Sequence, residues 1–276
     1  MIKIGQMNRL KVVKQVDFGI FLAGADFGNI LLPRRYVPAG VEPGDELEVF
    51  VYLDSNDEVI ATTLTPKAMV GECACLQVKE INEVGAFLDW GLPKDLLVPY
   101  NEQHKPMEIG RHYVVTLFLD PYSHRITASS RLNRHLDERA YGLKPHQAVD
   151  LLICGRSEMG YKAVINHRFL GLIFRDDAFR PLSYGERVQG FIKAIRPDRK
   201  IDLSLQPSSR EGRQDLAAQV LQYLRDNHGV SYLTDKSNPE EIYRQFNVSK
   251  GKYKNALSSL YKERKILIEK DKITLV

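Results

Sequence analysis

The chain repeats itself, and this repeat limits the possible folds more than any other feature of the sequence. Gly19-Ile20-Phe21-Leu22 returns as Gly85-Ala86-Phe87-Leu88, and at the same offset Leu31-Leu32-Pro33 returns as Leu97-Val98-Pro99. A weaker third copy follows. In every copy two glycines keep the same spacing, namely Gly19 and Gly44, Gly85 and Gly110, and Gly160 and Gly185. A spacing kept in three places indicates three copies of one small module.

Each copy has the pattern of short β-strands. In the first copy, alternating apolar residues predict strands over residues 10–15, 20–22, 29–32, 47–53 and 59–64, with glycine and proline between them. Five strands in so short a module favour a small closed barrel, because closure removes the exposed strand edges. Ile20 and Leu22 then face the interior, and Phe21 faces outward. The same alternation places Phe87 outward in the second copy.

Several of these residues resemble the S-one motif, an RNA-binding repeat with the OB fold. The resemblance rests on the Phe18–Leu22 stretch, the Pro43-Gly44-Asp45 turn, Asp120 followed by Arg125-Ile126, and the strand ends Thr127-Ala128-Ser129 and Asp202-Leu203-Ser204-Leu205. It implies that aromatic residues on strands two and three stack on bases, while a basic residue near strand five contacts phosphate. Stacking on an aromatic ring stabilises each base by roughly 1–3 kcal/mol without demanding a particular sequence.

The three copies differ at the positions to which the resemblance gives a role. Glu58 occupies the place of the basic residue in the first copy, and Pro33, Pro99 and Phe174 stand where many S-one motifs have a histidine. The resulting candidate contacts are Phe21 in the first copy, Phe87 and Arg125 in the second, and Tyr161, Lys162, Phe174 and Lys200 in the third. We expect the third copy to suit RNA best and the first copy least.

Two alternative interpretations remain open for these aromatic residues. Each of them could pack between neighbouring domains instead of facing a ligand. Tyr161 directly follows Gly160 and matches the inward positions of Ile20 and Ala86, so it could be a core residue.

The C-terminal segment changes to a helical period. Leu216, Val220 and Leu224 predict a first helix, and Asn238-Pro239 marks the start of a second. Ser249 then caps a third helix after a short turn at Asn247-Val248, and residues 266–270 and 273–276 form a closing hairpin. The predicted inner face of the third helix consists of Tyr253, Leu257, Leu260 and Tyr261.

Three helices followed by a hairpin resemble a winged helix-turn-helix domain. The resemblance implies that Lys250, Lys252 and Lys254, at the start of the recognition helix, contact nucleic acid. Alternatively, these lysines simply form the solvated face of an amphipathic helix.

Charge and length add further limits. Acidic side chains outnumber basic ones through position 143, and basic side chains outnumber acidic ones from position 144 onward, so a polyanion is drawn to the back half. The length fits four small domains, which we expect at 1–67, 68–135, 144–207 and 211–276.

No apolar run reaches the roughly 18 residues of a membrane span, and the N-terminus lacks the apolar core of a signal peptide. Three cysteines, an odd number, favour a reducing compartment, and we expect a cytoplasmic location.

The sequence shows no pattern typical of an enzyme. It contains no glycine-rich phosphate loop, nucleophile elbow or zinc-binding histidine motif. Cys73 and Cys75 share one face of a strand without two further ligands nearby, so they are predicted to be buried strand residues, not part of a metal site. We expect a protein without a cofactor, a metal or catalytic activity.

The order of domains is more specific than any one of them. A mainly β protein with three S-one-type barrels followed by one α+β winged helix is similar to the conserved virulence factor B family. The resemblance implies a bacterial protein that binds single-stranded RNA and influences gene expression after transcription. Two alternatives are a DNA-binding transcriptional regulator that uses the winged helix, and a ribosome-associated factor.

Overall fold

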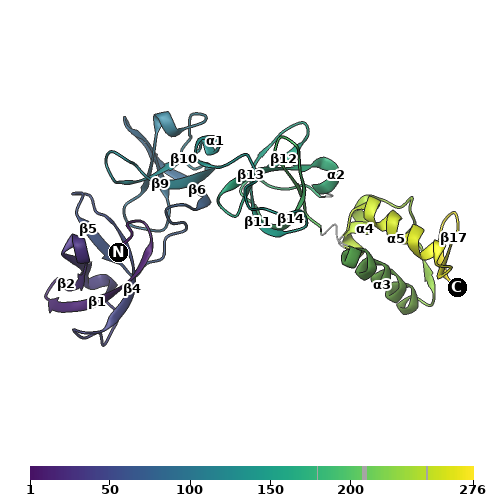
Figure 1. Cartoon of the computed structure of the whole chain (residues 1–276), viewed down its shortest axis with the longest axis horizontal. Coiled ribbons are helices and arrows are strands. Elements are labelled where there is room, and N and C mark those ends of the chain that lie inside the picture. Colours follow the sequence, from purple (N-terminus) through teal and green to yellow (C-terminus); the bar gives the residue numbers. More distant parts are fainter. Residues whose placement is uncertain (179, 207–209, 247) are drawn as a thin grey trace. The chain divides into compact units, whose positions relative to one another are not determined.

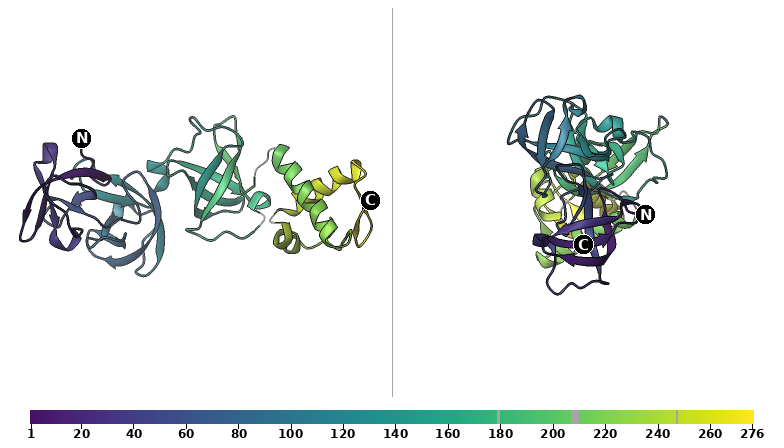
Figure 2. Two further views of the ribbon diagram at one scale, coloured as in Figure 1. Left: turned by 90° about the horizontal axis from the view of Figure 1, so that it is seen from below. Right: turned by 90° about the vertical axis from the view of Figure 1, so that its left-hand side faces the viewer.

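The protein folds into three closed five-stranded barrels and a C-terminal helical domain (Figure 1). This architecture comes from a computed structural model that describes residues 1–178, 180–206, 210–246 and 248–276. Figure 2 shows the strands of the barrels and the helices of the C-terminal domain from two further sides. The predicted fold class, mainly β with tandem OB-type barrels and a winged helix, is confirmed.

All three barrels have the same strand order, in which the fifth strand lies between the third and the fourth. The first barrel contains β1 (Met7–Val16), β2 (Gly19–Ala23), β3 (Asn29–Pro33), β4 (Glu46–Leu53) and β5 (Val59–Thr62). The second contains β6 (Cys73–Ile81), β7 (Gly85–Asp89), β8 (Leu96–Pro99), β9 (His112–Leu119) and β10 (Ile126–Ser129). The third contains β11 (Ala148–Arg156), β12 (Gly160–Ile165), β13 (Phe169–Phe174), β14 (Arg187–Ile195) and β15 (Ile201–Ser204).

Short helical turns decorate the barrels. They are η1 (Ala25–Phe27), η2 (Arg34–Tyr36), η3 (Tyr100–Glu102), α1 (Leu132–His135) and α2 (Arg175–Ala178).

The repeated glycines have the same physical role in each barrel. A Cβ atom on Gly19, Gly85 or Gly160 would collide with a backbone carbonyl oxygen of the neighbouring third strand. The second glycine of each copy has a positive φ, and its amide donates to a carbonyl of the first strand. These bonds are Gly44 to Val12 at 2.9 Å, Gly110 to Val78 at 2.8 Å and Gly185 to Ile153 at 2.8 Å. The constant spacing therefore records one piece of backbone geometry that all three barrels share.

The C-terminal domain consists of α3 (Arg210–Asp226), β16 (Val230–Ser231), α4 (Pro239–Phe246), α5 (Lys250–Lys262), β17 (Ile266–Ile268) and β18 (Ile273–Leu275). The three strands form one sheet in the order β16, β18, β17. The predicted cap is confirmed, since the Ser249 hydroxyl accepts a hydrogen bond from the Lys252 amide at 3.3 Å. Val248 lies in the predicted turn before α5, and Asn247 falls outside the described residues.

One predicted core residue of this domain is wrong. Tyr253, Leu257 and Leu260 are buried on the inner face of α5, but Tyr261 is 53 % exposed. Around the helix, Tyr261 lies about 100° from Leu260 and about 40° from Leu257, which places its side chain at the edge of the buried stripe.

The chain divides into two compact units, residues 1–136 and 137–276. Within the first unit, the first two barrels share a hydrophobic cluster. The Phe50 ring of the first barrel meets the Trp90 ring of the second edge to face, with the centroids 5.7 Å apart. Both side chains are almost fully buried, so this contact joins the two barrels through apolar surface that water does not reach.

Candidate nucleic-acid interface

The outward side of the second strand carries the first candidate residues. Phe21 and Phe87 are half-buried at this position, while Lys162 is exposed. Their neighbours along the strand are buried in each barrel. The alternation predicted from the sequence therefore places these three residues on the outer face of their barrels.

The first barrel presents a cation and two aromatic rings together. A shift in register between β1 and β2 pairs Lys14 with Phe21, and the Lys14 ammonium lies 5.0 Å from the ring centroid. Phe18 meets Phe21 edge to face at 6.1 Å and is 60 % exposed. Lys14 and Phe18 were not among the residues expected to bind. Phe18 could have been found as the aromatic residue before the repeated glycine, but the register shift that brings in Lys14 leaves no mark in the sequence.

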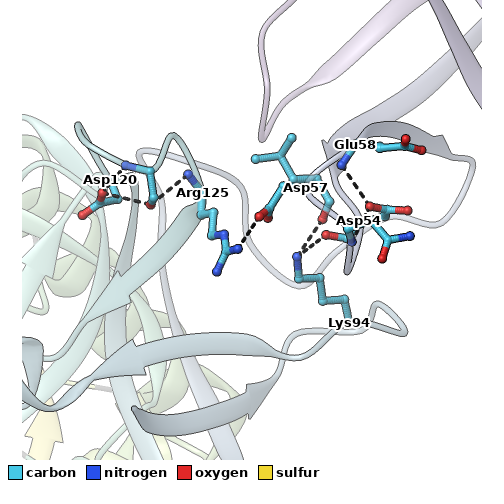
Figure 3. Close-up of polar contacts among 9 residues, drawn as sticks. Asp54, Asp57, Glu58, Lys94, Asp120 and Arg125 are labelled. Atoms are coloured by element: carbon cyan, nitrogen blue, oxygen red, sulfur yellow. Dashed lines mark hydrogen bonds and ion pairs between the residues drawn. The ribbon is translucent and has the colours of Figure 1, made fainter.

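In the second barrel, the residue expected to contact phosphate is Arg125, and it has a carboxylate partner within the protein. The Arg125 guanidinium forms an ion pair with Asp57, which lies in the turn between β4 and β5 of the first barrel (Figure 3). The hydrogen bond from Arg125 lowers the pKa of Asp57, and the same bond raises the pKa of Arg125. Arg125 is therefore paired across the junction of the two barrels.

A lysine strengthens this junction. The Lys94 ammonium donates to the Leu53 carbonyl at 3.1 Å and to the Asp54 carbonyl at 2.5 Å. Partial burial lowers the pKa of Lys94. Figure 3 shows Lys94 and Arg125 reaching the same acidic turn from the second barrel.

Tyr161 is a core residue, which corrects its expected role as a stacking platform. It is only 8 % exposed and belongs to the hydrophobic cluster of the third barrel. The reason is the two-residue period of β12, since Tyr161 follows Gly160 and occupies the inward position of Ile20 and Ala86. The alternative left open by the sequence is the correct one.

The third barrel retains an outward aromatic residue among cations. Phe174, at the end of β13, is half-buried, and the Arg196 guanidinium lies 5.3 Å from its ring centroid. Arg196 is held in place by Asp202, whose carboxylate it meets at 2.8 Å. The side chains of Lys162 and Lys200 are exposed. Phe174 and three cations therefore stand on the outer strands and turns of this barrel.

The three lysines of α5 differ in their surroundings. The Lys250 ammonium donates to the Ser237 carbonyl at 2.9 Å. Partial burial lowers the pKa of Lys252 to about 8. Lys254 is exposed to solvent. Of these three, Lys254 presents its charge most fully to a ligand in solution.

The described parts of the chain hold no candidate metal centre. No cluster of three or more histidine, cysteine or acidic side chains there could hold a metal ion. Cys73 is buried and Cys75 is half-buried on β6. No described helix combines the length and apolar character needed to cross a membrane.

Comparison with known proteins assigns the domains. The S1 domain family, which corresponds to the S-one motif, matches residues 4–64 and 70–130, and the CvfB-like winged helix domain matches residues 218–275. The third barrel lies outside these matches, but it shares the strand order and both glycine contacts of the first two. These are nucleic-acid-binding domains, and the chain is a multidomain protein of that class.

The full-length relatives agree with the assignment. The Bacillus subtilis protein YitL is 28 % identical over 96 % of this chain and 91 % of its own length. Conserved virulence factor B of Staphylococcus aureus is 28 % identical over 99 % of this chain and 94 % of its own length. The chain is therefore similar over nearly its full length to conserved virulence factor B, and it carries S1 domains and a CvfB-like winged helix domain. A crystal structure from Streptococcus pneumoniae, described as a multidomain protein with nucleic acid binding domains, covers 99 % of this chain and 98 % of its own at 24 % identity and a TM-score of 0.42.

Proposed function

We propose that the protein binds single-stranded RNA in the bacterial cytoplasm and regulates gene expression after transcription, without catalytic activity of its own. The observation that carries the proposal is the pairing of outward aromatic rings with cations on the first and third barrels. Phe21 has Lys14 beside it. Phe174 has Arg196 beside it, which Asp202 holds in place, and the exposed Lys162 and Lys200 on the same barrel are the cations available to phosphate. A ring can stack on any base while the nearby cation meets the phosphate, which suits an unpaired strand with exposed bases.

The alternative of duplex DNA binding through the winged helix has weaker support. Recognition helices contact DNA with residues at their N-terminal end. At that end of α5, Lys250 is engaged with the Ser237 carbonyl, and partial burial lowers the pKa of Lys252. Lys254 alone of the three candidate lysines is exposed.

A competition experiment tests the proposal. The full chain is titrated into a fluorescein-labelled 12-nucleotide oligo(U), and binding is followed by fluorescence anisotropy. Unlabelled oligo(U) should displace the probe, and a duplex DNA of the same length should displace it at least ten times less effectively. Equal displacement by the duplex would contradict the preference for single strands. The variant Phe21→Leu keeps an apolar residue and removes the ring, so its loss of affinity reports stacking on the first barrel.

A further inference from the structure

A cavity of about 420 Å³ lies where the first two barrels meet. This size is within the range of roughly 300–1,000 Å³ found for small-ligand sites. Tyr52 of β4 lines it from the first barrel, and Val84, Phe87 and Leu97 line it from the second. Tyr52 is buried, Phe87 and Leu97 are half-buried, and Val84 is exposed, so part of the cavity lining is apolar.

Two cations that line this junction groove already have partners in the first barrel. Arg125 is paired with Asp57, and Lys94 donates to the carbonyls of Leu53 and Asp54 (Figure 3). The acidic turn of the first barrel thus occupies Arg125, the residue to which the S-one resemblance gives the phosphate contact. An incoming phosphate would have to displace a carboxylate that belongs to the same compact unit.

The groove is also lined by carboxylates, and one of them has no partner in the part of the chain that the structure describes. The Asp95 carboxylate lining it is bonded to Lys79 at 2.8 Å. Glu80 also lines the groove and is exposed, and no hydrogen bond or ion pair of its side chain is found among the described residues. A free carboxylate beside a half-buried ring repels phosphate and attracts a cation.

The first barrel contains the contact between a cation and an aromatic ring that such a cation would form in the second barrel. The strand register pairs Lys14 with Phe21 in the first barrel and Glu80 with Phe87 in the second. In the first barrel the cation over the ring is supplied by the chain itself, at 5.0 Å from the centroid. In the second barrel the same position carries a carboxylate, so the ring of Phe87 has no cation of its own at that position.

We propose that the junction groove binds the lysine or arginine side chain of a basic segment in a partner protein. The guest cation stacks on Phe87, pairs with Glu80, and lays its aliphatic stem along Leu97 and Val84. It thereby supplies from outside the contact that Lys14 makes with Phe21. This interaction is additional to RNA binding and does not depend on it.

The test measures binding of a fluorescein-labelled tetra-arginine peptide to the full chain by anisotropy, with a tetra-citrulline peptide of the same shape and no charge beside it. Phe87→Leu removes the ring but keeps an apolar strand residue, and Glu80→Gln removes the charge. Each should weaken tetra-arginine binding about three- to tenfold. Glu48→Gln, at an exposed position on β4, makes the same charge change outside the groove and should leave binding within twofold of the original.

Four results would overturn the proposal. The citrulline peptide could bind as tightly as the arginine peptide. Glu48→Gln could weaken binding as much as Glu80→Gln, which would mean unspecific attraction to an acidic surface. Spermidine could displace the peptide at the peptide's own affinity, which would make a free polyamine the ligand. Oligo(U) could lose affinity in Phe87→Leu, which would make the groove a nucleic-acid site.

A charge reversal separates this proposal from RNA binding. Glu80→Lys gives the second barrel the lysine and ring of the first, so it should abolish tetra-arginine binding while oligo(U) affinity is kept or raised. Retained tetra-arginine binding in Glu80→Lys would contradict the proposal, whatever the protein does with RNA. Melting temperatures of all variants, measured in parallel, exclude loss of the fold as the cause.

Discussion

Single residues at equivalent positions give the three barrels different surfaces on one framework. The same register position holds one residue pair in each barrel. The pairs are Lys14 with Phe21, Glu80 with Phe87, and Gly155 with Lys162. The buried neighbours of these residues must fill a barrel interior of fixed size, which limits their chemistry. The outward residues are free of that limit, so the repeats have diverged there.

The repeated glycine at the start of the second strand should tolerate no side chain. In Gly160→Ala the new Cβ would meet the Ile173 carbonyl oxygen. We expect the free energy of unfolding of the third barrel to fall by at least about 1–2 kcal/mol, measured by urea denaturation. Gly251→Ala in α5 is the matched control, since its Cβ meets nothing within 4 Å, and it should be neutral or up to about 1 kcal/mol more stable. An unchanged stability of Gly160→Ala would show that the strands can separate at this point.

Tyr161 and Phe174 should respond to substitution in opposite ways. Tyr161→Ala empties a buried position and should cost about 3 kcal/mol of stability. Phe174→Ala removes a half-buried outward ring and should lower RNA affinity by about 1–3 kcal/mol with a smaller loss of stability. Thermal unfolding and anisotropy on the same samples separate the two effects. A Phe174→Ala protein that binds RNA normally would remove this residue from the interface.

Among the elements, the turn between the fourth and fifth strands has a different use in each of the first two barrels, where it joins β4 to β5 and β9 to β10. In the first barrel, the Asp54 carboxylate accepts hydrogen bonds from the amides of Asn56 and Glu58 at 2.8 and 3.0 Å. These bonds stiffen the turn that carries Asp57 to Arg125. In the second barrel, the Asp120 carboxylate likewise accepts from the amides of Tyr122 and Ser123 at 3.0 and 2.7 Å. The same pattern of hydrogen bonds therefore stiffens two turns. In the first barrel the turn presents Asp57 to the second barrel, and in the second barrel the turn leads to Arg125.

The Asp57–Arg125 pair makes the stability of the first unit depend on acid pH. The hydrogen bond from Arg125 lowers the folded-state pKa of Asp57 below its usual value of about 3.9. The pair therefore stabilises the folded state fully above that value, and its contribution is lost as the pH falls through the folded-state pKa. The melting temperature of Arg125→Gln should be lower than that of the unmodified protein at pH 7, by a small amount because the pair is exposed to solvent. The difference should shrink as the pH falls below about 3.9 and vanish once the carboxyl group of Asp57 is protonated in the folded state.

Variants of this pair also test the role of Arg125 in RNA binding. Because Asp57 already neutralises Arg125, Arg125→Gln should leave the salt dependence of oligo(U) binding unchanged. Lys200→Gln, at the matching position of the third barrel, should lower the salt slope by about one unit. A reduced slope in Arg125→Gln would show that RNA displaces Asp57.

At the scale of the whole molecule, the charge is divided between the two compact units. The basic excess lies after residue 143, and the unit boundary falls at residue 136. Binding to phosphate releases counterions, so affinity carried by the second unit should fall steeply with salt.

Separate production of the two units tests this division. The fragment 137–276 should keep most of the oligo(U) affinity at 50 mM salt and lose it between 50 and 200 mM. The fragment 1–136 should bind more weakly and with a smaller salt slope, since Lys14, Phe18 and Phe21 act on an acidic background. If the fragment 1–136 binds as tightly as the full chain, charge distribution does not decide where RNA binds.

The strands, the helices and their capping residues were predictable because they depend on neighbours in the chain. Glycine spacing, the two-residue period and the Ser249 cap are local features, and each is found in the structure as predicted. The same local reasoning was wrong for Tyr261. The predicted apolar stripe of the helix included one residue too many, and that residue is exposed to solvent.

Three barrels, a winged helix and the outward direction of Phe21 and Phe87 follow from the pattern of the sequence alone. Which charges remain available to a ligand depends on the folded arrangement of the chain. The Asp57–Arg125 pair joins residues 68 positions apart, and Lys14 faces Phe21 only because the register shifts in β1. The physical reason is that burial and secondary structure follow from local periodicity, whereas an electrostatic site depends on which distant side chains folding brings within a few ångströms of one another.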